Sequence, residues 1–189
     1  YCYIKMLGGE GLKKATMGAI LNANYLKDRL KDYYPILYTG NNGHVAHEMI
    51  LDINRISHTT GVAAIDIAKR LMDYGFHAPT VAFPVHETLM VEPTESEPLA
   101  ELDRFVDAMI KIRQEIKDIE DGKAPQGDNI ISHAPYTAEM LMANEWQFPF
   151  TREEAGFPLK SDVQDKYFPH VTRIDDAFGD RNLVCRVME

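Results

Sequence analysis

The chain has 189 residues, of which 45% are hydrophobic and 26% are charged, the balance of an ordinary soluble globular protein. Its net charge is -9, and its basic residues are scattered, which disfavours nucleic acid as a partner because a phosphate backbone is bound by clustered basic side chains. No apolar run approaches the roughly 20 residues that span a bilayer, so we expect no membrane segment. The length fits one core-bearing domain with an extension.

The termini carry the two cysteines, Cys2 and Cys185. Their spacing suits neither a disulfide framework nor a metal finger, so a reducing compartment is expected. The sequence from Tyr1 to Leu7 looks like the middle of a chain. We therefore expect a fragment of a longer protein.

A long amphipathic helix is expected over residues 10–32, because apolar residues recur there at steps of three and four. The pair Tyr34-Pro35 ends it, since the residue before a proline avoids the helical region. The glycines before it, Gly8, Gly9 and Gly11, lack a full phosphate-binding pattern and favour a plain hinge. The apolar stripe comprises Leu12, Ala15, Ala19, Ala23, Leu26 and Leu30.

Two strands, at residues 36–38 and 45–53, are expected to form an antiparallel hairpin around the turn at residues 39–43, which contains Asn42-Gly43. His44, His47 and Glu48 are of the types that bind zinc. Positions three apart on a strand face opposite sides of a sheet, however, so we favour surface or structural histidines over a metal pair.

A second helix is expected over residues 61–74 after a polar loop at residues 54–60. Thr60 would be its N-cap and Gly75 its C-terminal stop. Its buried stripe is predicted to contain Val62, Ile65, Ala68 and Met72, widened by Ile67 and Leu71.

The stretch at residues 73–97 holds the densest chemistry of the chain. Pro79 and Pro93 bracket an apolar run at residues 88–91 that is typical of a buried strand. Polar groups at the ends of such a strand lie on loops, where function is usually carried. These groups are His77, Thr80, His86, Thr88, Glu92, Thr94 and Glu95.

A third helix is predicted to run to about residue 120 and to pack on the sheet, with its start capped by Thr94 or Ser96. Helix, hairpin, helix, strand and helix together predict an α+β fold, a small antiparallel sheet covered by helices. Residues 1–122 would form this domain, including an N-terminal linking helix. Residues 123–189 would form a long wrapping tail, rich in proline and aromatic residues, with one short helix near residues 137–143, packed on the domain or on a missing half of the protein.

Six strings carry a family resemblance: Y-I-K-M-L-G-G-E-G-L-K, I-L-N-A-N-Y, D-Y-G-F-H-A-P-T, T-L-M-V-E-P-T-E-S-E, E-L-D-R-F-V-D-A-M-I-K-I-R-Q-E-I and R-I-D-D-A-F-G-D-R-N-L-V-C. They closely resemble the C-terminal part of glycine decarboxylases, the P-proteins of the glycine cleavage system. The resemblance covers nearly the whole chain, least well at residues 121–145. It implies the small C-terminal domain of a fold-type-I enzyme of pyridoxal phosphate, which completes an active site.

For the intact enzyme, the resemblance implies decarboxylation of glycine on pyridoxal phosphate and transfer of the aminomethyl group to lipoyl-H-protein. The family's cofactor lysine follows a Ser/Asn-x-His pattern, and no lysine of this chain has that setting. We therefore expect the fragment alone to be inactive, to hold no cofactor covalently and to bind no metal. Its partners would be the missing N-terminal half, the lipoyl carrier and a second copy in a homodimer or heterotetramer, in the cytoplasm of a bacterium or the mitochondrial matrix of a eukaryote.

The candidate site residues are polar groups of the stretch at residues 73–97, which the resemblance makes one wall of an active site. His77 and Glu92 are candidates to assist catalysis, and Thr80, Thr88 and Thr94 to face the substrate or the lipoyl arm. For His77, a role in capping a helix end is an equal alternative, and the threonines are more typical of local backbone contacts. No arginine lies between Arg70 and Arg104, so a departing carboxylate would be poorly solvated here, which favours decarboxylation.

For three further groups of residues, a surface or structural role competes with a functional one. His86 lies outside the matching strings and is expected on the surface. Cys185 would be a redox-sensitive thiol or, more simply, a buried free one. The charges at residues 173–176 and 179–181 favour salt-bridged packing over a metal site. A second functional class stays open, an interaction domain that docks a lipoyl carrier or a second subunit without a catalytic residue of its own.

Overall fold

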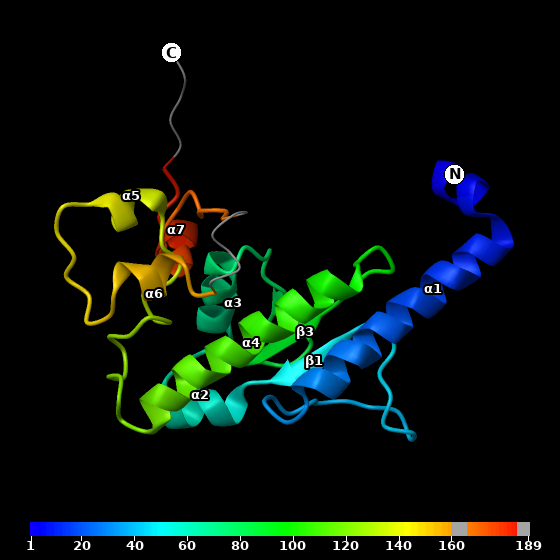
Figure 1. Cartoon of the computed structure of the whole chain (residues 1–189), viewed down its shortest axis with the longest axis horizontal. Helices are drawn as coiled ribbons and strands as arrows, with labels where there is room; N and C mark the ends of the chain where they lie inside the picture. The colour runs from blue at the N-terminus through cyan, green and yellow to red at the C-terminus, as the bar shows by residue number, and fades with distance from the viewer. Residues whose placement is uncertain (160–165, 185–189) are drawn as a thin grey trace, which may run out of the picture.

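The computed structural model describes residues 1–159 and 166–184. A three-stranded antiparallel sheet with the order β1-β3-β2 lies against helices (Figure 1), which confirms the α+β fold. The elements are α1 (Cys2–Leu30), β1 (Met49–Asp52), α2 (Asn54–Thr60), α3 (Ala64–Asp73), β2 (Thr80–Val81), β3 (Thr88–Val91), α4 (Leu99–Glu120), α5 (Ala138–Met142), α6 (Arg152–Gly156) and α7 (Asp176–Arg181).

The central strand β3 has the bounds that the sequence predicts, residues 88–91. It pairs with β1 so that Met49 lies opposite Val91 and Leu51 opposite Leu89. These four side chains are buried in one core with residues of α1, α3 and α4. Alternation along the strands therefore places one apolar face of the sheet toward the helices.

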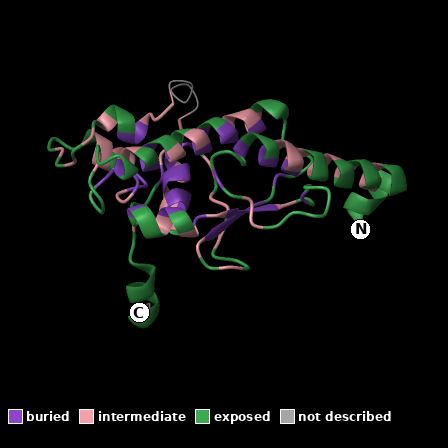
Figure 2. Cartoon of the chain, turned by 90° about the horizontal axis from the view of Figure 1, so that it is seen from below, coloured by how far each residue is buried: buried purple, intermediate pink, exposed green. Residues whose placement is uncertain are grey.

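Helix α4 is the central helix of the layer, because α1, α2 and α3 all pack against it. In α1 the predicted stripe is buried at Ala23, Leu26 and Leu30. The N-terminal half of α1 projects away from the body and is exposed (Figures 1 and 2). Gly8, with a φ of 61°, interrupts the helix there, a conformation that glycine adopts at little cost.

The expected hairpin before β1 is reduced to one bridge, between Ile36 and Leu51. The turn closes through a hydrogen bond from the Gly43 N–H to the Gly40 carbonyl. Residues 44–48 are not a strand, so the strand prediction for this segment is wrong. His47 lies at a bend, where side chains no longer alternate between two faces.

The prediction for residues 54–74 is wrong in its boundaries. The supposed polar loop is α2, and Thr60 is its last residue, not the N-cap of the next helix. Helix α3 begins at Ala64, and the Asp66 carboxylate accepts a hydrogen bond from the Ala63 N–H (2.8 Å). Its stop at Gly75, with a φ of 77°, is confirmed.

The buried face of α3 also differs from the prediction. Ile65 is 40% exposed, and the inward stripe contains Ala64, Ile67 and Leu71. A fully buried arginine, Arg70, lies beside this stripe. A guanidinium thus takes an inward position that composition alone would assign to solvent.

Helix α4 ends at Glu120 as predicted, but Pro98 occupies its N-cap position without a side-chain cap. The hydroxyl of Thr94 accepts a hydrogen bond from the Ser96 N–H (3.3 Å). Neither Thr94 nor Ser96 caps α4, so that expectation is wrong.

The tail contains more structure than predicted. The short helix near residue 140 is confirmed as α5, whereas α6 and α7 were missed. Tyr136, Trp146 and Phe150 form a small aromatic core there. These three helices lie at the end of the molecule opposite the start of α1 (Figure 1). The division of the chain at residue 122 stays a prediction.

A buried ionic network joins this tail to the domain. The Arg70 guanidinium donates to the carboxylates of Glu115 (2.9 and 3.1 Å) and Asp73 (3.0 Å), and to the carbonyls of Glu154 and Ala155 (both 2.9 Å). Burial raises the pKa of Asp73 to about 6, against the opposing effect of the Arg70 guanidinium. Of the helices in the described part of the chain, none is long and apolar enough to cross a membrane.

Candidate functional site

A cleft of about 430 Å³ opens beside the end of β3. Its walls come from α1, the loop after α3, β2, β3 and the start of α4. The apolar lining consists of Leu26, Phe76, Ala78, Pro79, Met90, Val91, Pro93, Leu102 and Phe105, and the polar lining of His77, Thr80, Glu92, Glu97 and Glu101.

His77 reaches the cleft because the chain turns sharply after α3. Gly75 allows the turn, and Phe76 then anchors the loop by packing edge-to-face on Phe105, with 5.3 Å between the ring centres. The guanidinium of Arg104 lies 3.7 Å from the centre of the Phe76 ring. The His77 side chain is exposed at the cleft, as expected for a group that faces another part of a protein.

Glu92 follows the last residue of β3 and is held between two buried residues, Val91 and Pro93. Its carboxylate is exposed, and within the described ranges, 1–159 and 166–184, no lysine or arginine forms an ion pair with it. Thr80, opposite Met90 in the sheet, lines the same cleft. Of the five predicted site residues in the central stretch, the structure thus brings together His77, Thr80 and Glu92.

The cleft is acidic, because its lining contains three carboxylates and neither lysine nor arginine. Glu101 is paired: Arg104 donates to both of its oxygens (2.7 and 2.9 Å) and this hydrogen bonding lowers the pKa of Glu101. Glu92 and Glu97 remain as exposed carboxylates at the opening. Such a lining favours an ammonium group and disfavours a phosphate or a carboxylate.

Pyridoxal phosphate does not fit this lining. Its aldehyde requires a lysine and its phosphate requires cationic or N–H donors, and the cleft supplies carboxylates instead. The residues that line this cleft therefore would not hold the cofactor.

Two predicted threonines lie outside the cleft. Thr88 is fully buried, and its hydroxyl donates to the Val85 carbonyl (2.5 Å), so it does not line the cleft. Thr94 is exposed, but it does not line the cleft and its hydroxyl is used by the turn to Ser96. Both satisfy local backbone groups, the plainer of their two expected roles.

The remaining candidates are placed as follows. His86 is on the surface as predicted, with its side chain 84% exposed. Cys185 lies outside the described residues. Arg173 is ion-paired with Asp66 and donates to the Ala134 carbonyl (3.1 Å), so the prediction of salt-bridged packing is confirmed for this residue.

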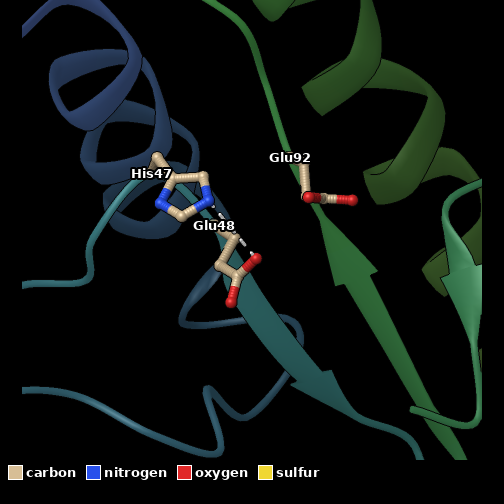
Figure 3. A group of neighbouring side chains, drawn as sticks. All are labelled: His47, Glu48 and Glu92. Carbon is tan, nitrogen blue, oxygen red and sulfur yellow. Dashed lines mark ion pairs between the residues drawn. The ribbon is translucent and has the colours of Figure 1, made fainter. Parts of the chain in front are cut away.

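The histidines before β1 behave differently from each other. His44 lies 3.2 Å from the Asn24 carboxamide oxygen, an ordinary surface contact. His47 lies beside Glu48, with 3.6 Å between Nε2 and Oε2, and both are close to Glu92 (Figure 3). Strand alternation does not set the directions of His44 and His47, because residues 44–48 are not a strand, and His44 is not part of the group around His47.

Comparison with known proteins identifies the family. The family described as "Glycine dehydrogenase, C-terminal domain" matches residues 15–136. The chain belongs to this family. It is 58% identical to the glycine dehydrogenases (decarboxylating) of Bordetella avium and Variovorax paradoxus and 56% identical to that of Xanthomonas euvesicatoria. Each alignment covers 98% of this chain and 19% of the relative, so the chain spans about a fifth of the length of these glycine dehydrogenases.

Membership of the glycine dehydrogenase family confirms the resemblance found in the sequence strings. Sequence reasoning nevertheless missed Phe76, Glu97 and Glu101 as parts of the cleft. Phe76 and Glu97 lie within the stretch that was singled out, so their position was a usable signal. Glu101 resembles any solvated first-turn glutamate, and only the packing of α4 brings it to the cleft.

Proposed function

We propose that this chain is the C-terminal part of a glycine dehydrogenase (decarboxylating) and that its cleft forms one wall of the active site. The observation that carries the proposal is the convergence of His77, Thr80 and Glu92 on one cleft, in a chain whose relatives bear that name. The opposite wall, with pyridoxal phosphate and its lysine, would come from residues outside this chain. The chain by itself is then inactive.

The acidic lining suits the chemistry of the proposed reaction. Glycine and the transferred aminomethyl group both carry an amine, which Glu92 and Glu97 would attract. A carboxylate placed here meets no lysine or arginine of the lining, so its conversion to neutral carbon dioxide relieves an unfavourable contact. We propose that the group is passed to the lipoyl arm of a carrier protein, and that His77 donates or accepts the proton that this transfer moves.

Two substitutions in the complete protein test these roles. Glu92→Gln removes the charge and keeps the shape, and we expect at least a tenfold loss in kcat/KM for glycine, the scale on which one electrostatic or acid–base contact acts. His77→Gln is expected to lower kcat more than it raises KM. His86→Gln is the matched control, since that histidine is exposed away from the cleft lining. Unchanged turnover and glycine affinity in both cleft variants would show that His77 and Glu92 have only a structural role.

The predicted inactivity of the chain alone has its own assay. We expect the purified chain, mixed with pyridoxal phosphate, to show no aldimine absorbance band. A band that borohydride converts into a modified lysine of this chain would contradict the proposal.

A second candidate function is docking of a lipoyl carrier or of another subunit. It is favoured by exposed apolar side chains along α1, among them Tyr3, Met6, Met17 and Leu21. A calorimetric titration of the chain with lipoylated carrier protein distinguishes the two candidates. Binding that Met17→Ser abolishes and Glu92→Gln leaves unchanged would favour docking over a catalytic wall. The bacterial relatives favour the cytoplasm over the mitochondrial matrix as the location, and the oligomeric state stays a prediction.

A further inference from the structure

Three side chains from two segments far apart in the sequence gather where β1 begins and β3 ends (Figure 3). One ligand atom each from His47, Glu48 and Glu92 lies within 4.8 Å of the other two. The bend at His47 brings its imidazole to the side of the chain on which Glu48 lies. The group thus contains one nitrogen and two carboxylates.

The pairing of the strands sets the two carboxylates against each other. Met49 lies opposite Val91, so Glu48 and Glu92 occupy the next position of the same antiparallel register. Side chains at such a position have Cβ atoms about 4.5–5.5 Å apart, and like charges there repel. Within the ranges that the structure describes, no lysine or arginine forms an ion pair with either glutamate. His47 is the basic side chain beside Glu48, at 3.6 Å, and a cation held by all three groups would offset the repulsion between the glutamates.

The donor set selects the class of cation. Imidazole nitrogen with carboxylate oxygen suits zinc and similar first-row divalent ions, whereas calcium and magnesium prefer oxygen alone. In a tetrahedral zinc centre with bonds of about 2.0–2.2 Å, the donor atoms lie roughly 3.3–3.6 Å apart. His47 and Glu92 are exposed and Glu48 is half-buried, so side-chain rotation closes the remaining distance without a movement of the strands.

We propose that His47, Glu48 and Glu92 bind one divalent transition-metal ion of the zinc type at the rim of the cleft. Three protein ligands leave a position for water or for a group of a ligand, the arrangement of an open site rather than a closed structural one. This proposal differs from the expectation from sequence that the chain binds no metal. Glu92 is 44 positions from Glu48, so the spacing of residues along the chain does not reveal the group. The proposal shares Glu92 with the proposed function but does not rest on it, because His47 and Glu48 do not line the cleft and metal binding is measured without turnover.

The test is titration of the 189-residue chain with zinc by calorimetry and with cobalt by visible absorbance, which reports the coordination geometry. We expect one equivalent to bind, with the absorbance of a four- or five-coordinate cobalt ion. His47→Gln and Glu92→Gln are each expected to weaken binding at least tenfold. His86→Gln is the matched control, since His86 lies 3.7 Å from Glu87 and forms a similar pair without a third ligand.

A second readout is the thermal midpoint of the chain, which zinc is expected to raise and which His47→Gln makes insensitive to zinc. Absence of a one-equivalent step, or equal affinity in wild type and both variants, would overturn the proposal. The same titration on the complete protein, freed of metal by a chelator, should again show the site. If only the isolated chain binds metal, a basic side chain from the rest of the protein takes the position and the proposal is wrong for the intact molecule.

Discussion

Replacement of Arg70 by methionine is the perturbation with the largest expected effect on stability. The guanidinium is 0% exposed and donates five hydrogen bonds. Without it, the buried carboxylates of Asp73 and Glu115 lose their ion pair and keep the hydrogen bonds from the Tyr136 N–H (2.7 Å) and the Tyr74 hydroxyl (3.1 Å). The carbonyls of Glu154 and Ala155 lose the guanidinium as a donor. Removal of one partner of a buried ion pair costs about 3–5 kcal/mol. We expect the free energy of unfolding to fall by this amount, a large share of the roughly 5–15 kcal/mol typical of a domain.

Urea unfolding, followed by the fluorescence of the single tryptophan, Trp146, and by far-UV circular dichroism, measures this loss. Trp146 reports the tail, since its indole N–H donates to the Phe150 carbonyl (2.5 Å). Arg29→Met is the matched control, because its pair with Asp103 is exposed and should contribute no more than about 1 kcal/mol. A difference below 1 kcal/mol between the two variants would refute the reasoning that Arg70 holds the tail to the domain.

Three further predictions concern single residues. Because the pKa of Asp73 is raised from 3.8 to about 6 in the folded chain, the folded state binds a proton more tightly than the unfolded state. The free energy of unfolding contributed by this group therefore decreases as pH rises from about 4 to 6, by about 3 kcal/mol in total. Urea titrations at several pH values should show this decrease in wild type and not in Asp73→Asn. Gly75→Ala should cost about 1 kcal/mol by the same assay because of its positive φ, and a neutral result would contradict the role of the turn. Thr88→Val should lower the free energy of unfolding by about 1 kcal/mol, because the hydrogen bond to Val85 is lost, and should leave turnover of the complete protein unchanged. Loss of turnover without loss of stability would show that Thr88 contributes to the active site.

The sheet could be predicted where its signal was local. The strand at residues 88–91 is a short apolar run between turn residues, and its bounds are those of β3. The strand before it was overextended, because the pairing of β1 with β3 begins at Met49 and, in the described part of the chain, residues 45–48 belong to no strand. In α2, the error arose because the polar residues 54–60 are typical of a loop, yet they form a helix whose N-cap residue, Ile53, makes no side-chain cap hydrogen bond.

The candidate site could be predicted in part for a similar reason. His77, Thr80 and Glu92 lie at the ends of one predicted strand or of the preceding helix, so proximity in sequence brought them together. Glu48 and His47 belong to another segment, and only the register of β1 on β3 places them beside Glu92. The burial of Arg70 could not be predicted from sequence either, since it depends on hydrogen-bond partners 45 and 85 positions away.

The most direct test that this cleft forms one wall of the active site is release of carbon dioxide from carboxyl-labelled glycine. It is measured on the complete protein with a substitution that fills the cleft. Thr80→Trp places an indole in the cleft, whereas Thr94→Trp places one on the exposed surface outside its lining. We predict that Thr80→Trp lowers kcat/KM at least tenfold and that Thr94→Trp stays within twofold of wild type, at equal thermal midpoints. Equal activity of the two tryptophan variants would contradict the account that this cleft faces the substrate.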